Sequence, residues 1–215
     1  MTKTTATNDQ IPKLLAKALA ANRYEFDATV TEKLVNFLYL LERWNQVFNL
    51  TAIRDIEEMI PLHILDSLAV NPFLHGQRII DVGTGAGLPG IPLALINPDK
   101  VFFLLDSNGK KTRFLNQAKV DLGIKNMEVV HARCEDFAIL PAFDSIVSRA
   151  FSSIPVMLAK TQHLAAPDGQ FIAMKGTYPG QEIEQIPDGF RVCKTQQLTI
   201  KGLTAQRHVV CIQRL

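Results

Sequence analysis

Hydrophobic and polar positions in the first third of the chain alternate at the spacing of helices. Apolar side chains recur every three or four residues over 11–21 and again from about residue 29 to residue 48, which is typical of helices with one buried face. The run Thr29-Val-Thr-Glu32 fits a capping box, in which a hydroxyl and a carboxylate each satisfy a free backbone donor. We therefore expect the second helix to begin there.

A third helical stretch is expected to start at Asp55, which is followed by Glu58 in the first turn. Pro61 has no backbone N–H to donate and predicts a kink or a restart in this helix, and Asn71-Pro72 predicts its end. Residues 1–75 are thus expected to form an N-terminal helical cap.

After residue 76 the pattern changes to short apolar runs that alternate with helical stretches. Strands are expected at 78–82, 101–105, 127–130, 145–148 and 170–174, with helices at about 89–96, 109–122 and 154–164. Near-continuous apolar strands connected by helices are typical of a parallel sheet that is covered on both faces. Two further strands, 191–198 and 207–213, follow each other without a helix, which predicts an antiparallel hairpin at the sheet edge. We expect an α/β domain over 76–215.

The strongest local signal is the glycine-rich run Asp81-Val-Gly83-Thr-Gly85-Ala-Gly87-Leu-Pro-Gly90, which follows the first expected strand and opens a helix. Glycines allow a tight turn and the close approach of a ligand, and free N–H groups at a helix start favour an electronegative group. Asp106 ends the second expected strand, where a carboxylate can accept hydrogen bonds from two ribose hydroxyls. The pattern predicts a nucleoside cofactor.

The choice of cofactor depends on Asp81. The spacing of Gly85, Gly87 and Gly90 also fits a dinucleotide site, but Asp81 lies directly before the loop and would repel a pyrophosphate. Its carboxylate could instead meet the amino group of the methionine part of S-adenosylmethionine (AdoMet). The expected C-terminal hairpin favours AdoMet as well.

The stretch IIDVGTGAGLPGIPLALINPD at 79–99, with LLDSNGKKTRFL at 104–115, resembles the bacterial 16S rRNA guanine-N7 methyltransferase family, also called glucose-inhibited division protein B. Further matches occur in the family's order: Trp44-Asn45, Asn49-Leu50-Thr51, His63-x-x-Asp66-Ser67, Arg133-x-Glu135, Ser148-Arg149-Ala150 and Lys175-Gly176. One departure is Cys134, where many members carry alanine.

The resemblance implies a class I AdoMet-dependent methyltransferase: a Rossmann-like, mostly parallel seven-stranded sheet with an antiparallel C-terminal hairpin and the helical cap. It implies that the methyl group of AdoMet goes to N7 of a guanine in 16S rRNA of the small ribosomal subunit and that S-adenosylhomocysteine (AdoHcy) is released. The implied cofactor site combines the glycine loop, the acids after the first strands, and positions expected beside the ribose, the adenine and the methionine: Asp81, Gly83, Gly85, Gly87, Leu88, Asp106, Cys134, Glu135 and Arg149.

Guanine N7 carries a lone pair and no proton, so its attack on a sulfonium methyl group needs no general base. We therefore expect no catalytic acid or base, only alignment and the exclusion of water, and orientation of this kind can contribute ~7–11 kcal/mol. Arg133, Arg149 and Lys175 are expected at strand ends, where each could bind guanine O6 and leave N7 free. Each could also simply pair with a carboxylate.

Two further clusters have competing interpretations. Lys110, Lys111 and Arg113 fall in the first turns of a helix, where cations are unfavourable by ~0.3–1 kcal/mol each. A bound RNA phosphate would offset that penalty, whereas a solvated helix face is the simpler interpretation. His63 and Asp66 lie three residues apart, and we expect them to dock the helical cap onto the sheet rather than to act as a catalytic pair.

Composition limits the function without deciding it. The chain has 215 residues, of which 47% are hydrophobic and 20% charged, as in ordinary globular proteins. Residues 1–75 hold 7 Lys and Arg against 9 Asp and Glu, and residues 76–215 hold 16 against 12, so the basic excess lies in the later part and is compatible with a polyanionic partner. The cysteines and histidines are scattered, which predicts neither a disulfide nor a metal site.

No apolar run approaches the length of a membrane span, and the polar start predicts no signal peptide, so we expect a cytoplasmic protein without a membrane partner. We also expect a monomer. A methyltransferase for a small molecule or a protein stays open, as does a nicotinamide dehydrogenase, against which Asp81 and the hairpin argue. A ribosome-assembly factor that binds AdoMet without turnover is the non-enzymatic alternative. The sequence does not distinguish free rRNA from the assembled subunit as the substrate.

Overall fold

The computed structural model describes residues 10–215, so the polar start on which the signal-peptide prediction rests lies outside the described residues. One sheet of seven strands runs in the order β3-β2-β1-β4-β5-β7-β6. Its strands are β1 Arg78–Val82, β2 Val101–Asp106, β3 Met127–His131, β4 Phe143–Arg149, β5 Ala165–Lys175, β6 Phe190–Gln197 and β7 His208–Arg214. Every strand expected from the sequence is present, and β5 begins five residues earlier than expected.

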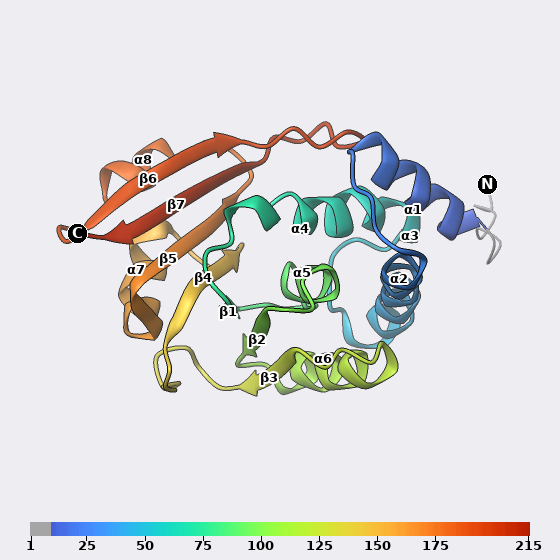
Figure 1. Ribbon diagram of the computed structural model, residues 1–215, viewed down its shortest axis with the longest axis horizontal. Coiled ribbons are helices and arrows are strands. Elements are labelled where there is room, and N and C mark those ends of the chain that lie inside the picture. The colour runs from blue at the N-terminus through green and yellow to red at the C-terminus, as the bar shows by residue number, and fades with distance from the viewer. Residues whose placement is uncertain (1–9) are drawn as a thin grey trace.

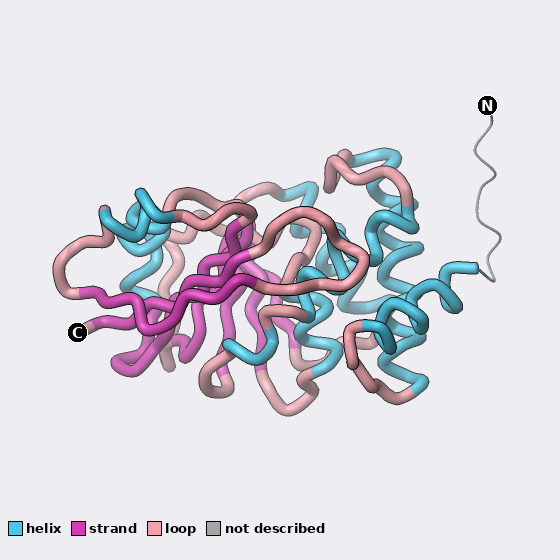
Figure 2. The backbone as a smooth tube through the Cα atoms, turned by 90° about the horizontal axis from the view of Figure 1, so that it is seen from above, coloured by secondary structure: helices cyan, strands magenta, loops and turns pink. Residues whose placement is uncertain are grey.

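Helices lie against both faces of the sheet (Figure 1). The helices up to α6 gather on one side, and α7 and α8 lie on the other; Figure 2 shows the same separation from above. The helical elements are α1 Gln10–Ala21, α2 Ala28–Phe48, α3 Ile56–Met59, the π-helix η1 Ile60–Leu65, α4 Asp66–Leu68, the 3-10 helix η2 Asn71–Phe73, α5 Gly90–Ile96, α6 Gly109–Asp121, α7 Ile154–Thr161, the 3-10 helix η3 Gln162–Leu164 and α8 Gly180–Glu184.

The two C-terminal strands form an antiparallel hairpin at the sheet edge, as expected. β7 lies between β5 and β6 and is antiparallel to both, so β6 is the edge strand. The reason is hydrophobicity: β7 is buried along most of its length, whereas β6 is largely exposed. The more apolar strand takes the interior position, where both its faces are covered.

The capping box expected at Thr29 is wrong. The helix begins one residue earlier, at Ala28, and Asp27 caps it by accepting a hydrogen bond from the N–H of Val30 at 2.7 Å. A carboxylate at this position also interacts favourably with the positive end of the helix dipole. The sequence interpretation placed the cap on the hydroxyl of Thr29 and overlooked the acid two residues before it.

Pro61 does not make the chain restart. The helical path continues from α3 through η1 to α4, and Pro61 stands at the start of the π-helical turn. A wider turn accommodates a residue that cannot donate to the backbone ladder, and π-helical turns are frequent at functional sites. Asp55 does cap α3 as expected, by accepting from the N–H of Glu57 at 3.0 Å.

The helical cap and the sheet share one hydrophobic core. A single cluster of buried side chains joins residues of α1 and α2 to residues of β1, β2 and α6, and Trp44 of α2 packs against Phe114 of α6 with ring centroids 5.7 Å apart. A second cluster lies between the opposite face of the sheet and α7. The division of the chain at residue 75 stays a prediction. Within residues 10–215, no helix is long and apolar enough to cross a membrane.

Candidate functional site

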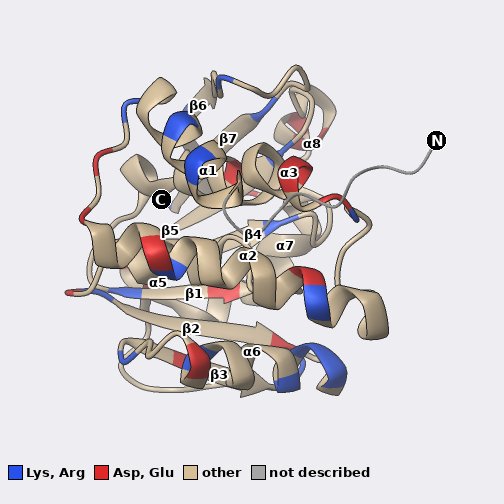
Figure 3. Ribbon diagram, turned by 90° about the vertical axis from the view of Figure 1, so that its right-hand side faces the viewer, with Lys and Arg blue, Asp and Glu red and all other residues tan. Residues whose placement is uncertain are grey.

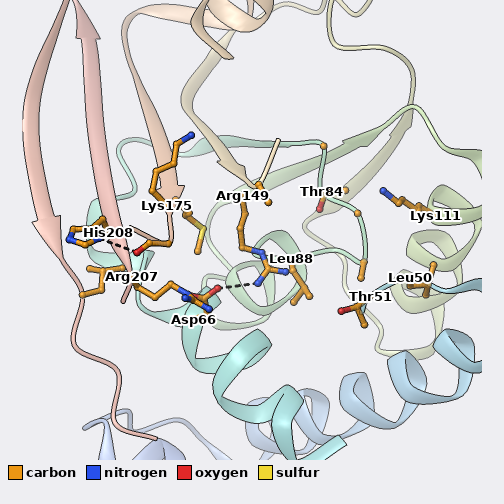
Figure 4. Close-up of a pocket in the computed structure, with 17 residues that line it drawn as sticks. Leu50, Thr51, Asp66, Thr84, Leu88, Lys111, Arg149, Lys175, Arg207 and His208 are labelled. Atoms are coloured by element: carbon orange, nitrogen blue, oxygen red, sulfur yellow. Dashed lines mark hydrogen bonds and ion pairs between the residues drawn. The ribbon is translucent and has the colours of Figure 1, made fainter. Parts of the chain in front are cut away.

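The strand order reverses between β1 and β4, which are parallel neighbours. In open α/β sheets this reversal leaves a crevice outside the carboxyl ends of the strands, where ligands bind. Here the crevice holds two cavities of about 550 Å³ and about 290 Å³. Gly83, Lys111 and Ala150 line both, so they form a neck between a larger cavity (Figure 4) and a smaller one.

The glycine loop forms one wall of this neck. Gly83, Gly85 and Gly87 all adopt left-handed backbone angles, with φ of +69°, +61° and +78°, a conformation that favours glycine. At Gly83 an added Cβ would lie 2.6 Å from the ring of Phe151, so a residue with a side chain would also clash at this position. Gly83, Gly85 and Leu88 line the larger cavity, whereas Gly87 shapes the turn without lining either one.

Asp81 lies beneath the glycine loop rather than in a cavity. It is 1% exposed, and its Oδ2 accepts hydrogen bonds from the hydroxyl of Thr84 at 2.6 Å and from the N–H of Gly90 at 2.8 Å. Burial raises the pKa of this carboxyl to about 6. Its Oδ1 is buried and has no hydrogen-bond partner among residues 10–215. The contact with a methionine amino group, predicted from the sequence, would have to use that oxygen.

Asp106 lines the smaller cavity and is already hydrogen-bonded to the glycine loop. Its Oδ2 accepts from the N–H of Gly85 at 2.9 Å and lies 3.5 Å from Nζ of Lys111, while its Oδ1 accepts from the N–H of Asn108 at 2.9 Å. An ionised carboxylate has about four acceptor positions, so two ribose hydroxyls would compete with the long contact to Lys111. Asp106 could therefore accept hydrogen bonds from a ribose if Nζ of Lys111 moved away from its Oδ2.

Arg133, Cys134 and Glu135 line the smaller cavity together with Asp106. The thiol of Cys134 donates to Glu135 at 3.0 Å, and burial raises the pKa of that thiol to about 11. Nζ of Lys160 lies 2.7 Å from the other carboxylate oxygen of Glu135. Hydrogen bonds from Lys160 and Cys134 lower the pKa of Glu135 to about 2. Lys160 is a lining residue that the sequence reasoning missed.

The buried carboxylate of Asp66 joins two arginines at the larger cavity. Its Oδ2 lies 3.0 Å from Nη1 of Arg149, and its Oδ1 lies 2.8 Å from Nε of Arg207. Arg149 also donates to the carbonyl of Leu62 at 3.2 Å. Since Asp66 lies in α4 and Arg149 ends β4, this ion pair connects the helical cap to the sheet, as the sequence interpretation expected of Asp66.

His63 contributes to the same junction through a different partner. Its Nε2 lies 2.9 Å from the hydroxyl of Thr51, which lines the larger cavity. Burial, together with the nearby charge of Arg149, lowers the pKa of His63 to about 4, so the ring is neutral at pH 7. The amide of Asn45 fixes the same loop by donating to the carbonyl of Ile53 and accepting from the N–H of Thr51, both at 2.9 Å. His63 therefore supports the cavity wall.

Lys175 lines the larger cavity but is held away from its centre. Its Nζ lies 2.7 Å from the carboxylate of Glu182 in α8 and donates to the carbonyl of Ser152 at 2.9 Å. The Glu182 carboxylate also accepts from the N–H of Ile154. Of the two interpretations left open for Lys175, the structure shows the pairing with a carboxylate.

The three cations at the start of α6 point in different directions. Lys111 is half-buried and faces the neck beside Asp106, whereas Lys110 and Arg113 are exposed. Figure 3 shows the first turns of α6 as a basic end of the helix. The exposed pair is available to an external anion, but Lys111 belongs to the cavities.

Arg207 and His208 also line the larger cavity, and the sequence reasoning missed both. A topological signal could have found them. β7 is antiparallel to β5, and His208 at its start pairs with Lys175 at the end of β5. The first residues of an antiparallel strand therefore lie at the same sheet edge as the carboxyl ends of the parallel strands.

Together, a sheet with one antiparallel strand inserted beside the edge, a glycine loop after β1 and an acid at the end of β2 define a class I methyltransferase. Solved structures of that class have the same fold. A coclaurine N-methyltransferase bound to N-methylheliamine and SAH aligns with a TM-score of 0.59 and 11% identity over 97% of this chain and 96% of its own. A SAM-dependent methyltransferase from Aquifex aeolicus aligns with a TM-score of 0.55 and 19% identity over 72% and 92%.

Sequence comparison narrows the class to one family. Residues 30–210 match the family described as GidB, rRNA small subunit methyltransferase G. Proteins named ribosomal RNA small subunit methyltransferase G from Shewanella amazonensis and Legionella pneumophila are each 48% identical to this chain. The first match covers 91% of this chain and 95% of the relative, and the second 95% and 96%. The chain belongs to the GidB family.

The buried carboxyl of Asp81 predicts a pH-dependent stability. Because its pKa rises from an ordinary value of 3.8 to about 6 on folding, protonation stabilises the folded state below about pH 4, and this contribution is lost as the pH rises through about 6. The free energy of unfolding of the wild type, relative to that of Asp81→Asn, should therefore be larger at pH 5 than at pH 7 by about 1 kcal/mol.

Urea unfolding of the two proteins at both pH values measures this difference. The titration of His63 occurs in both proteins and cancels in the comparison. The same stability difference at pH 5 and pH 7 would show that Asp81 is ionised throughout.

Proposed function

We propose that this chain transfers the methyl group of AdoMet to N7 of a guanine in 16S rRNA of the small ribosomal subunit. The observation that carries the proposal is the near full-length match to relatives named for rRNA small subunit methylation, at 48% identity over up to 95% of this chain. Two adjoining cavities support it, because they provide separate places for the nucleoside end of the cofactor and for an acceptor.

The residues fit the cofactor in three respects. Asp106 presents a carboxylate to the smaller cavity, and the left-handed glycines leave backbone room at the neck. Asp81 keeps a buried oxygen that has no hydrogen-bond partner among residues 10–215. When bound, AdoMet supplies an electrophilic methyl group on a sulfonium. We infer that Asp106 holds the ribose, that Cys134 and Glu135 flank the adenine, and that Gly83 lines the passage to the larger cavity, into which Arg149 extends.

The acceptor atom is inferred from the state of the charged groups in the larger cavity. Asp66 is paired with two arginines, Lys175 with Glu182, and Lys111 with Asp106. Each of these groups already has a partner of opposite charge. An acceptor that had to lose a proton would need a free base close to it, whereas guanine N7 needs only alignment and the exclusion of water. The charged side chains of the cavity thus offer no free base, and His208, whose Nδ1 lies 3.1 Å from the carbonyl oxygen of Gly176, is the cavity-lining group that an acceptor with a proton would have to use. N7 is the acceptor that needs none of these groups as a base.

Other parts of the proposal stay predictions: that the enzyme acts as a monomer in the cytoplasm and uses no metal. The non-enzymatic alternative, a ribosome-assembly factor that binds AdoMet without turnover, is tested by the same experiment as the reaction itself.

That experiment measures methyl transfer from labelled AdoMet to unmodified small subunits, to protein-free 16S rRNA and to a protein extract. After digestion of the RNA to nucleosides, the label is expected in 7-methylguanosine. Comparing the subunit with bare RNA identifies the recognised form. Label in protein or in another nucleoside would contradict the proposal, and AdoHcy binding without any transfer would favour the assembly factor.

Asp106→Ala should weaken AdoHcy binding by at least about ten-fold, because hydrogen bonds to a charged group contribute about 1.5–3 kcal/mol each. Isothermal titration calorimetry measures the dissociation constant. Asp99→Ala is the matched control, since Asp99 is exposed and lies in the turn before β2. Unchanged affinity in Asp106→Ala would remove Asp106 from the cofactor site.

The exposed cations of α6 should contribute to rRNA binding only. Lys110→Glu combined with Arg113→Glu should leave the AdoHcy dissociation constant within two-fold and lower kcat/KM for rRNA. The slope of log kcat/KM against the logarithm of the salt concentration should become shallower by about one for each lost phosphate contact. Lys13→Glu combined with Lys17→Glu makes the same charge change on the exposed face of α1 and serves as the control. Equal activity of the two double variants would make the α6 pair an ordinary solvated surface.

A further inference from the structure

Arg207 is fixed in the larger cavity by contacts that leave part of its guanidinium group free. Its Nε lies 2.8 Å from the buried Asp66 carboxylate, and its Nη1 donates to the carbonyl of Gln206 at 2.8 Å. Nη2 has no hydrogen-bond partner among residues 10–215. A guanidinium held on two of its three nitrogens is a pre-oriented donor.

The other cations that line the cavity are either paired at their charged end or less firmly oriented than Arg207. Lys175 is held by Glu182 and by the carbonyl of Ser152. Lys111 is paired with Asp106 at the neck. Arg149 is held through Nη1 alone, which donates to Leu62 and to Asp66, so its guanidinium is fixed at one nitrogen whereas that of Arg207 is fixed at two. Figure 4 shows Arg207 and Asp66 on the side of the cavity away from Thr84 and Lys111, with Arg149 between them.

The walls of the larger cavity suit a flat base better than a phosphate. Apolar side chains line the same cavity: Leu50, Leu88, Met174 and Leu198. Small-molecule sites typically combine such apolar walls with a few fixed polar groups that set orientation. A phosphate would leave these apolar walls without a complementary partner.

We propose that Nη2 of Arg207 donates to O6 of the acceptor guanine and that Asp66 is the positioning residue that holds this guanidinium in place. The inference rests on the proposed function, since it names the residue that recognises the acceptor of that reaction. O6 and N7 are neighbouring acceptors on one edge of guanine. A donor that binds O6 from the side of β7 leaves N7 turned toward the glycine loop.

The charge of the three residues fits the reaction as well. Guanine gains a positive charge when N7 is methylated, and two free guanidinium groups would oppose this. The carboxylate of Asp66 lies 3.0 Å from Arg149 and 2.8 Å from Arg207, so the three residues carry one net positive charge instead of two. Asp66 thus orients the donor and reduces the repulsion.

The test compares Arg207→Gln and Arg207→Lys with the wild type. Both variants should lower kcat/KM for rRNA about ten- to a hundred-fold, as expected for the loss of a hydrogen bond from a charged group, and should leave the AdoHcy dissociation constant within two-fold. Arg191→Gln is the matched control, because Arg191 is exposed near the opposite end of β6. The salt dependence of kcat/KM should be the same for Arg207→Gln as for Arg191→Gln.

Each other result overturns the inference in a distinct way. Activity equal to that of the control removes Arg207 from the acceptor site. If the slope of log kcat/KM against log salt concentration is smaller by about one in Arg207→Gln than in the control, Arg207 contacts a phosphate. If AdoHcy affinity falls by as much as kcat/KM does, Arg207 belongs to the cofactor site. If the wild type itself forms no 7-methylguanosine, the proposed function fails together with this inference.

The positioning role of Asp66 has a separate readout. If Asp66 acts through Arg207, the loss in kcat/KM of Asp66→Asn combined with Arg207→Gln should be smaller than the product of the two single losses. A merely structural role would move the melting temperature and leave the two losses multiplicative. Multiplicative losses would overturn the positioning role of Asp66.

Discussion

The buried carboxylate of Asp66 is the interaction on which the arrangement of the site depends. It lies in α4, and its two partners come from the end of β4 and from the residue before β7. A buried carboxylate without partners would be strongly unfavourable, so the helical cap, the parallel strands and the C-terminal strands have one low-energy arrangement around it. The larger cavity lies where these three parts meet, and its shape follows from the ion pairs.

The sequence predicts most of the fold because the relevant signals are local. Apolar runs mark the strands, and the glycines after β1 mark a turn that other residues adopt only with strain. The error at the start of α2 arises because two local signals compete there, Asp27 and Thr29. The order of the two C-terminal strands was left open by the sequence, since only the assembled sheet shows which of them is covered on both faces.

The sequence predicted the motif residues of the site but not the residues that pair with them. Motif positions such as Asp106, the last residue of β2, and Cys134, three residues after β3, lie at or near strand ends, and strand ends at one sheet edge are easy to recognise in a sequence. Their partners come from distant segments: Glu182 reaches Lys175 from α8, and Arg207 reaches Asp66 across 141 positions of the chain. No periodicity connects such residues, so the sequence could name Lys175 as a candidate but could not show that it is already paired.

The backbone at Ala150 explains how one strand end serves both cavities. Ala150 has a φ of +53°, a left-handed conformation that is unfavourable for a residue with a Cβ by roughly 1–2 kcal/mol. The turn it makes sends the side chain of Arg149 into the larger cavity and the ring of Phe151 into the smaller one. Strain of this kind persists only where the surroundings hold it in place, and here the ion pair of Arg149 with Asp66 does so. The contact that docks the helical cap therefore also stabilises the strained turn that separates the larger cavity from the smaller one.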